Sequence, residues 1–376
     1  MTPSEQPPLF GLPTGVRARF IEGVNGLRMH VLEAGYETAD RPCILLLHGF
    51  PELAYSWRKV MPALAGAGYH VVAPDQRGYG RTTGWDARYD GDVASFRQFN
   101  LARDALELVF ALGRQSVAAV IGHDFGSPVA AHCALIRPDV FRSVAMMSAP
   151  FAGPPALPLT PAGDIYADLA ALDRPRKFYQ LYYSTPDADA DMRDCRQGLG
   201  DFLRAYYHYK SADWPGNQPF RLASWSAAEL AKMPTYYVME AGTNMAQAVA
   251  PYMPSPAQIT ACAWLPDREL KVYADEFART GFQGGLNWYR CGTSGRNTRD
   301  LAIFSGRAIE VPALFIAGKS DWGVYQAPGA FEAMQTQACS QMLGCHLIEG
   351  AGHWVQQEQP GKVSELLLRF LSDVTS

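Results

Sequence analysis

Six short apolar runs recur along the chain, and most are separated by stretches in which apolar residues have helical spacing. Runs of this length without polar alternation are typical of strands that are buried on both faces of a sheet. Strands that alternate with helices predict an α/β fold, with a mostly parallel sheet flanked by helices. The runs occupy residues 43–47, 70–73, 117–121, 143–147, 311–317 and 345–349.

A hairpin precedes these runs. Residues 19–21 and 29–32 flank Asn25-Gly26, a dipeptide typical of the type I′ turn between antiparallel strands. We expect the hairpin at one edge of the sheet. Residues 1–15 are rich in proline and are expected to form a loose N-terminal arm. An amphipathic helix over residues 359–372 is predicted to close the chain.

The alternation stops between residues 151 and 306, where Tyr, Trp, Met and Pro are frequent. Because core strands lie on both sides, we interpret this stretch as a helical lid inserted into one core, which comprises residues 1–150 and 307–376. An independent second domain is the less economical alternative. The Met- and Pro-rich residues 233–256 match no predicted element. Helical pieces are predicted over residues 176–183, 200–209 and 267–280.

The pentapeptide Gly122-His123-Asp124-Phe125-Gly126 has the form small–X–nucleophile–X–small, with aspartate where lipases and esterases carry serine. An apolar run precedes it, and a predicted helix over residues 127–137 follows, with Pro128 in its first turn. Strand, sharp turn and helix are the context of a nucleophile elbow. A carboxylate is already ionised at neutral pH, so Asp124 is predicted to attack carbon directly and form an ester. A helix N-cap is its simpler alternative role.

Two more polar residues follow later strands: Asp321 after the run 311–317, and His353 after the last run. Nucleophile, acid and histidine in this order form the triad of α/β-hydrolases, and the carboxyl ends of parallel strands share one edge of a sheet. His353 is the predicted general base, and Asp321 is predicted to orient its imidazole. Asp300 and Asp267 are rival acids, but both lie in the predicted lid.

These motifs, together with His48-Gly49-Phe50-Pro51-Glu52, resemble the soluble epoxide hydrolase family of the α/β-hydrolase superfamily, from about residue 20 onward. In that family the lid carries two tyrosines. Their motifs are matched here by residues 178–182 and, over a longer stretch, by residues 281–290. The resemblance implies that Tyr179 and Tyr289 protonate the epoxide oxygen, which suits phenols facing a far more basic alkoxide. It also implies a cis Phe50–Pro51 bond.

The predicted reaction converts an apolar epoxide to a vicinal diol, with water hydrolysing the aspartyl ester. The backbone N–H groups of Phe50 and Phe125 are the predicted oxyanion hole. Phe125 stands where many family members have Trp, which changes the pocket wall. His123 is expected to support loops, and so is Asp75 together with Arg77. The predicted pocket residues are His48, Pro51, Phe178, Trp322 and Trp354; core packing and, for His48, loop support are their alternative roles.

Composition limits the partners and the compartment that we expect for this protein. The 376 residues carry a net charge of −4 and are 48% hydrophobic, which argues against nucleic acid or an anionic membrane as partner. No apolar stretch of about 18 residues and no signal peptide are evident. The seven cysteines form no CxxC pair, so we expect reduced thiols in a cytoplasmic protein, without metal or cofactor. The expected partners are the epoxide and water, and the expected state is a monomer or homodimer.

Two other functions remain open. A haloalkane dehalogenase uses the same core and an aspartate nucleophile, but it needs donors that hold a halide, and Phe50 and Phe125 offer no side-chain donor. A hydrolase-fold protein that binds an apolar ligand without turnover is the second alternative. A serine esterase is disfavoured because no Gly-x-Ser-x-Gly occurs.

Overall fold

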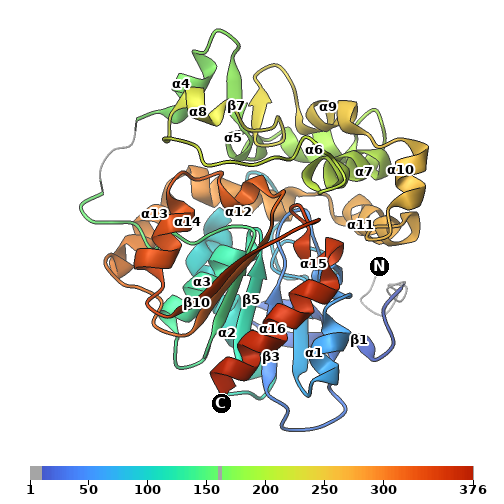
Figure 1. Cartoon of the computed structure of the whole chain (residues 1–376), viewed down its shortest axis with the longest axis vertical. Coiled ribbons are helices and arrows are strands. Elements are labelled where there is room, and N and C mark those ends of the chain that lie inside the picture. The colour runs from blue at the N-terminus through green and yellow to red at the C-terminus, as the bar shows by residue number, and fades with distance from the viewer. Residues whose placement is uncertain (1–10, 160–162, 376) are drawn as a thin grey trace.

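The computed structural model describes residues 11–159 and 163–375, so most of the predicted N-terminal arm lies outside the described residues (Figure 1). Its centre is an eight-stranded sheet in the order β1-β2-β4-β3-β5-β6-β9-β10. Strands β1 (Val16–Val24) and β2 (Leu27–Ala34) form the predicted antiparallel hairpin at one edge. Asn25 and Gly26 both have positive φ, as a type I′ turn requires.

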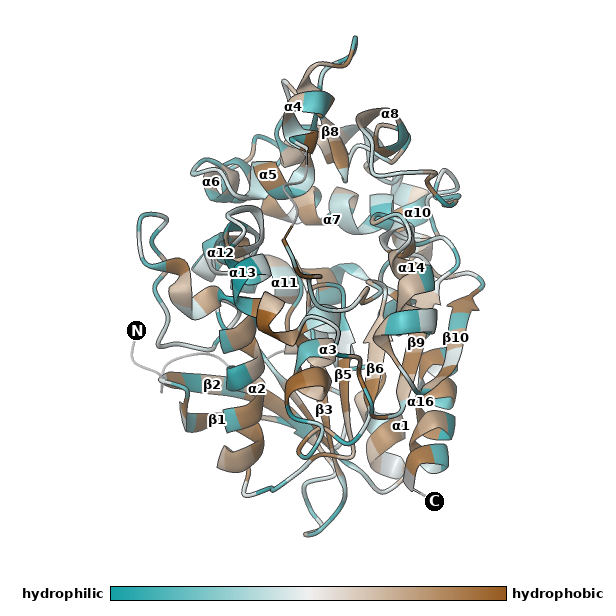
Figure 2. Ribbon diagram, turned by 90° about the vertical axis from the view of Figure 1, so that its left-hand side faces the viewer, coloured by the Kyte–Doolittle hydropathy of each residue, from teal (hydrophilic) through white to brown (hydrophobic). Residues whose placement is uncertain are grey.

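The six predicted core strands all form, with ends that shift by a few residues, and they pair in parallel with one another. Successive residues of β3 belong to opposite cores: Ile44 packs with one apolar cluster and Leu45 with the other. This two-sided burial explains the uninterrupted apolar runs, which Figure 2 shows in brown. The strands are β3 (Cys43–Leu47), β4 (His70–Pro74), β5 (Ala119–His123), β6 (Val144–Met147), β9 (Ala313–Gly318) and β10 (Met342–Ile348).

Helices cover both faces of the sheet. On one face, α1 (Met61–Gly66) and α16 (Pro360–Thr375) contribute side chains to a single apolar cluster, and α16 is the predicted closing helix. On the other face, α2 (Gln98–Ala111) and α3 (Gly126–Ile136) pack together. The mostly parallel sheet with helices on both faces confirms the predicted α/β class.

Between β6 and β9 the chain forms a largely helical layer above the sheet (Figure 1). The predicted helices over 200–209 and 267–280 are present as α7 (Leu199–Lys210) and α11 (Asp267–Thr280). The remaining helices of this segment are α4 (Ile165–Ala170), α5 (Tyr179–Tyr183), α6 (Ala188–Arg193), α8 (Ala227–Leu230), α9 (Met245–Val249), α10 (Pro256–Ala261), α12 (Gln283–Thr293) and α13 (Arg296–Leu301). Nearer the C-terminus lie α14 (Ala330–Ala333) and α15 (Val355–Glu358).

The predicted helix over residues 176–183 is wrong in its first part. Residues Arg176–Phe178 are strand β7, which pairs antiparallel with β8 (Val238–Glu240), and the helix begins only at Tyr179. The partner strand comes from the segment 233–256 that matched no predicted element. Met239 and Met245 of that segment are fully buried and fill the interior of this layer, whereas Met253 is exposed.

No helix among the described residues combines the length and the apolarity that a bilayer crossing requires.

Candidate active site

Asp124 lies at the sharp turn between β5 and α3, and its φ of +51° is unusual for a residue with a side chain. The flanking glycines make the turn possible. A Cβ atom at Gly122 would collide with the carbonyl of Gly126, and one at Gly126 would collide with the carbonyl of Leu47. The sequence predicted this elbow because only residues without a side chain fit two positions before and two positions after Asp124.

The Asp124 carboxylate has a different partner on each oxygen. The backbone N–H of Phe50 donates to Oδ1 at 2.8 Å, and Nε2 of His353 lies 3.3 Å from Oδ2. Burial alone would raise the pKa of Asp124, but the hydrogen bond and charge of His353, with the charges of Lys210 and His123, outweigh it. The pKa is therefore well below the ordinary value, and the group is a carboxylate at neutral pH.

The Phe50–Pro51 bond is cis, as expected. A Cβ at position 49 would collide with the Asp124 side chain, so Gly49 lets this loop aim the Phe50 amide at the carboxylate. Phe125, whose N–H is the second predicted oxyanion donor, is the N-cap residue of α3 directly after Asp124.

The structure brings Asp321 and His353 to Asp124. Oδ1 of Asp321 lies 3.1 Å from Nδ1 of His353, and both side chains are only 1% exposed. The N–H of Gly323 donates to the same Oδ1 at 2.7 Å. Burial would raise the pKa of Asp321, but the charge and hydrogen bond of His353 lower it overall. The carboxylate therefore fixes which His353 nitrogen carries hydrogen and leaves Nε2 directed at Asp124.

Ser148 is a member of this group that sequence reasoning missed. Its hydroxyl donates to Oδ2 of Asp321 at 2.5 Å and lies 2.9 Å from Nδ1 of His353. Ser148 directly follows β6, so its place at the carboxyl end of a core strand is the signal that could have found it.

The rival acids lie elsewhere. Asp300 pairs with Arg97, and Asp267 pairs with Arg204. Asp75 accepts from the backbone N–H of Ala54 at 2.9 Å and also bonds His30 and the N–H of Arg81, so it does join loops. Arg77 also joins loops, but not through Asp75: its guanidinium pairs with Asp104 on α2 and donates to the carbonyl of Asn25.

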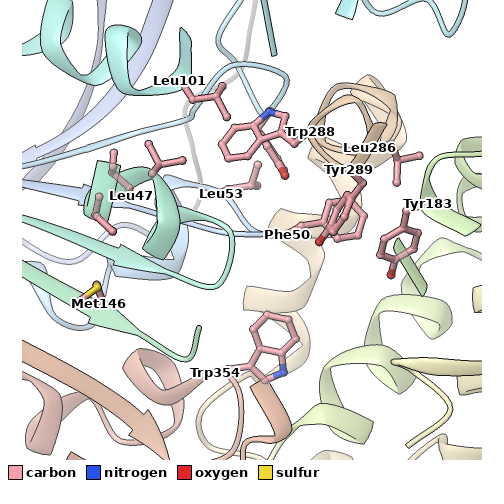
Figure 3. Close-up of a cluster of buried hydrophobic side chains, with 14 of the residues drawn as sticks. Leu47, Phe50, Leu53, Leu101, Met146, Tyr183, Leu286, Trp288, Tyr289 and Trp354 are labelled. Atoms are coloured by element: carbon pink, nitrogen blue, oxygen red, sulfur yellow. The ribbon is translucent and has the colours of Figure 1, made fainter. Parts of the chain in front are cut away.

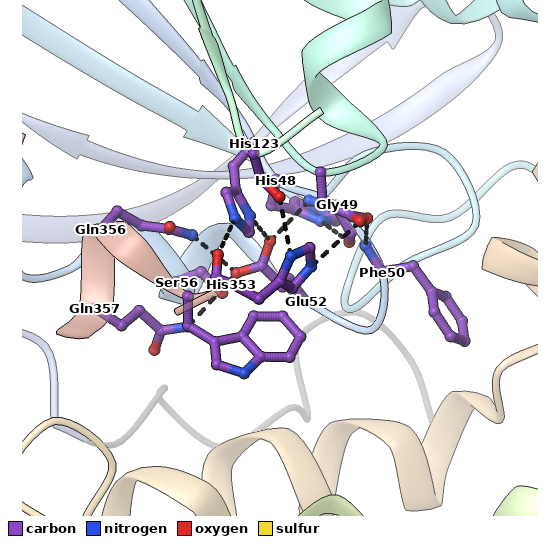
Figure 4. Close-up of polar contacts among 12 residues, drawn as sticks. His48, Gly49, Phe50, Glu52, Ser56, His123, His353, Gln356 and Gln357 are labelled. Carbon is purple, nitrogen blue, oxygen red and sulfur yellow. Dashed lines mark hydrogen bonds and ion pairs between the residues drawn. The ribbon is translucent and has the colours of Figure 1, made fainter. Parts of the chain in front are cut away.

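A buried polar cluster joins the loops beneath the site (Figure 4). His123 Nδ1 is 2.6 Å from Oε2 of Glu52, and its Nε2 is 2.7 Å from the carbonyl oxygen of His353. Both nitrogens face acceptors, which is the arrangement of an imidazolium. Burial would lower the pKa of His123, but the Glu52 carboxylate raises it overall. His123 thus supports loops, as expected, and Glu52 is the partner that the sequence did not identify.

His48, a predicted pocket residue, has both ring nitrogens engaged within the loops. Nε2 accepts from the N–H of Gln76 at 3.1 Å, so Nδ1 carries the hydrogen that is donated to the carbonyl of Gly49 at 2.9 Å. Burial lowers the pKa of His48, in keeping with a neutral ring.

Tyr289 on α12 and Tyr179 at the start of α5 lie next to each other, with ring centroids 5.8 Å apart. The Tyr289 ring also packs edge-on against Phe125 and Phe50, and Figure 3 shows it beside Phe50 and Tyr183. Burial, followed by the charge of Asp124, raises the pKa of both phenols, so both keep their protons at neutral pH.

Backbone contact sets the position of α12. A Cβ at Gly284 would collide with the carbonyl of Gly78, so the helix touches the core loop directly there. Four residues later, the Trp288 indole N–H donates to the carbonyl of Arg77 at 2.9 Å. These contacts place Tyr289, and they explain why the motif over residues 281–290 combines glycine, tryptophan and tyrosine.

The other predicted pocket residues are buried around the site. The Trp354 ring lies 4.6 Å from the His353 ring, and the Phe178 ring lies 5.1 Å from that of Tyr179. The Trp322 ring lies 5.0 Å from that of Phe220, and the carbonyl of Pro51 accepts from the Tyr207 hydroxyl at 2.7 Å. Whether these residues contact substrate stays a prediction.

A buried lysine on α7 also escaped sequence reasoning. The Lys210 side chain points into a group of aromatic rings at 4.9 to 5.6 Å, and its charge contributes to the low pKa of Asp124. No sequence signal marks this site, because the rings come from separate segments: Tyr206, Tyr236, Tyr237 and Trp354. Among the described residues no cluster of His, Cys, Asp and Glu has the arrangement of a metal site.

Comparison with known proteins identifies the relatives of this chain. The family with the alpha/beta hydrolase fold matches residues 42–218. Epoxide hydrolase A of Mycobacterium tuberculosis is 37% identical over 357 residues, which span 93% of this chain and 95% of that protein. An epoxide hydrolase of Caballeronia sordidicola is 31% identical over 96% of this chain and 95% of its own. The solved structure of an epoxide hydrolase from an endophytic Streptomyces matches with a TM-score of 0.78 and 32% identity, covering 96% of this chain and 97% of that one.

Proposed function

The chain belongs to the epoxide hydrolase family and is an epoxide hydrolase, and from that premise we propose that it opens an apolar epoxide through a covalent ester on Asp124. One observation carries the proposal. An ionised carboxylate, held by the Phe50 amide and facing His353, lies in a site where two protonated phenols interact with its charge. The aromatic rings of Phe50, Phe125 and Tyr183 around Tyr289 favour an apolar substrate.

In the first step a carboxylate oxygen of Asp124 attacks a ring carbon of the epoxide. A new carbon–oxygen bond forms, the ring carbon–oxygen bond breaks, and its electron pair goes to the epoxide oxygen. Tyr289 or Tyr179 donates a proton to that oxygen as it becomes an alkoxide. The raised pKa of both phenols ensures that the proton is present when the alkoxide forms.

In the second step water attacks the carboxyl carbon of the ester, and Nε2 of His353 takes the proton from that water. Negative charge develops on the carbonyl oxygen, where the N–H groups of Phe50 and Phe125 would receive it. The bond between this carbon and the alkyl oxygen then breaks, and the departing oxygen takes the proton from the imidazolium. The diol leaves with one oxygen that belonged to Asp124. The second proton of the water, now on the Asp124 carboxyl group, returns to the phenolate left by the first step, so both the carboxylate and the phenol are restored.

Oxygen isotopes test this sequence. In a single turnover with excess enzyme in ¹⁸O water, the first diol should carry unlabelled oxygen from the protein, and the label should appear in Asp124 by peptide mass spectrometry. Entry of ¹⁸O into the first diol, with none in Asp124, would mean that water attacks the epoxide itself. Asp139, an exposed aspartate paired with Arg137, serves as the internal control and should stay unlabelled.

A further inference from the structure

The loop that carries His353 is fastened to the lid helix α7 as well as to the core. The backbone N–H of His353 donates to the carbonyl of Lys210, the last residue of α7, at 2.9 Å. One turn earlier, the carbonyl of Tyr207 accepts from the Trp354 indole at 2.9 Å. A Cβ at Gly352 would lie 2.5 Å from the carbonyl carbon of Ser211, so the two backbones are in direct contact.

Glu358, at the end of α15, bridges these two segments. Its Oε2 accepts from the N–H of Gly352 at 2.9 Å and from the N–H of Ala212 at 2.8 Å, and its Oε1 accepts from the N–H of Trp354 at 2.9 Å. Gly352 and Trp354 flank His353, whereas Ala212 follows α7. One carboxylate therefore holds both neighbours of His353 against the lid.

The two oxygens of this carboxyl group satisfy all three donors; burial raises its pKa overall to about 8, although the three N–H groups lower that pKa. It accepts through both oxygens, whereas an amide of the same shape accepts through one oxygen and turns an NH₂ group toward a backbone N–H. On the opposite side, the carbonyl of His353 accepts from His123 at 2.7 Å. The backbone of His353 is thus held between a core contact through His123 and a lid contact through Lys210 and Glu358.

We propose that Glu358 is the positioning residue that couples the lid to His353 and thereby controls ester hydrolysis. This inference rests on the proposed two-step mechanism. Alkylation depends on a carboxylate that is already ionised and on the two phenols, so it tolerates a displaced imidazole. Hydrolysis depends on Nε2 of His353 within reach of a water and of the ester, and misplacement by about 1 Å can cost as much as ~10²-fold in rate.

The test is Glu358→Gln, measured in single turnovers with excess enzyme and styrene oxide as the substrate probe. Rapid quench followed by intact-protein mass spectrometry gives the rates of ester formation and ester decay separately. We expect decay to slow by about 10-fold or more, with formation changed by less than about two-fold. Glu365→Gln is the matched control, because Glu365 on α16 is exposed and forms an ion pair with Lys362; both of its rates should equal those of the unchanged enzyme.

Gly352→Ala displaces the same loop without touching Glu358, because the new Cβ would press on Ser211 and Ala212. It should slow ester decay in the same selective way. Thermal unfolding of each variant identifies any variant that does not fold. The rates of ester formation and decay in a variant that does fold then test the inference. Equal slowing of both steps, or unchanged ester decay in both variants, would overturn the inference. If the unchanged enzyme forms no ester at all, the proposed mechanism itself fails, which is a separate and distinguishable result.

Discussion

The core and the helical layer over residues 151–306, which we interpret as a lid, hold the groups of the proposed mechanism by different means. At the core, polar bonds fix each group: the Asp124 carboxylate by the Phe50 amide, and the His353 ring by Asp321. In the lid, aromatic packing fixes the phenols: the Tyr289 ring contacts Phe50, Phe125 and other rings, and among the described residues no protein group hydrogen-bonds its hydroxyl. The Tyr179 hydroxyl has two long hydrogen bonds: it donates to Oε1 of Gln326 and accepts from Nε2 of Gln180, both at 3.2 Å.

This difference follows from the charge that each part handles. The core holds a persistent carboxylate, and a buried charge is stable only when neighbouring groups hydrogen-bond or pair with it. The lid holds neutral phenols that, in the proposed mechanism, serve an oxygen supplied by the substrate. A hydroxyl that already had strong partners would lose them when it bound that oxygen, so aromatic packing positions the ring and leaves the hydroxyl available.

The largest expected effect concerns the core nucleophile. Asp124→Ala should lower kcat for diol formation by at least ~10⁴-fold, because it removes the atom that forms the covalent bond. Diol assays by gas chromatography measure the loss, and the intact mass should show no ester. A substantial residual rate would mean that a water molecule can open the epoxide without the core carboxylate.

His353→Gln separates the two steps within the core. Ester hydrolysis should slow by roughly 10³-fold because the general base is lost, whereas ester formation persists. Intact-protein mass spectrometry should show the enzyme accumulating as its ester. Failure to form any ester would indicate that the imidazole is needed for alkylation as well, and that core and lid do not divide the steps.

Variants of the lid phenols should have the opposite effect, slowing ester formation and not ester hydrolysis. The double variant Tyr179→Phe and Tyr289→Phe should slow ester formation by roughly 10²-fold, since no acid remains to protonate the alkoxide. Ester decay, measured after loading with a reactive epoxide, should change little. Each single variant should slow ester formation less than the double variant does, because the remaining phenol still donates a proton. If decay slowed instead, the assignment of the phenols as acids would be wrong.

The pH dependence of ester formation provides a milder test. The pKa of Asp124 is lowered, so the nucleophile stays ionised as the pH falls, and the acid limb should lie below the ordinary aspartate value of about 3.9. The pKa values of Tyr179 and Tyr289 are raised, so the basic limb should lie above about 10. Single-turnover rates should therefore be flat between about pH 5 and 9. A basic limb near pH 8 would argue against protonated phenols of raised pKa.

The smallest effects are expected at the rival acids. Asp267→Asn and Asp300→Asn each break an ion pair that is partly exposed, and such pairs contribute about 0 to 1 kcal/mol of stability. The rates of ester formation and ester decay should both stay within about two-fold of those of the unchanged enzyme. A large loss at Asp300 would call the role of Asp321 into question.

The sequence by itself determined the sheet strands, the elbow and the order of the reactive residues. Buried parallel strands require uninterrupted apolar runs, and the turn at Asp124 admits only glycine at positions 122 and 126, so local sequence carries both signals. The strand β7 escaped detection because its partner β8 lies 60 residues away, and pairing at that separation leaves no local pattern.

Tertiary structure alone decided which polar groups meet. Ser148, Glu52, Lys210 and Glu358 have ordinary sequence surroundings, and each reaches the site through a partner that is distant along the chain. The pairing of Arg77 with Asp104 was not predicted for the same reason. A hydrogen bond depends on distances of a few tenths of an ångström, which follow from the packing of the whole fold and not from neighbouring residues.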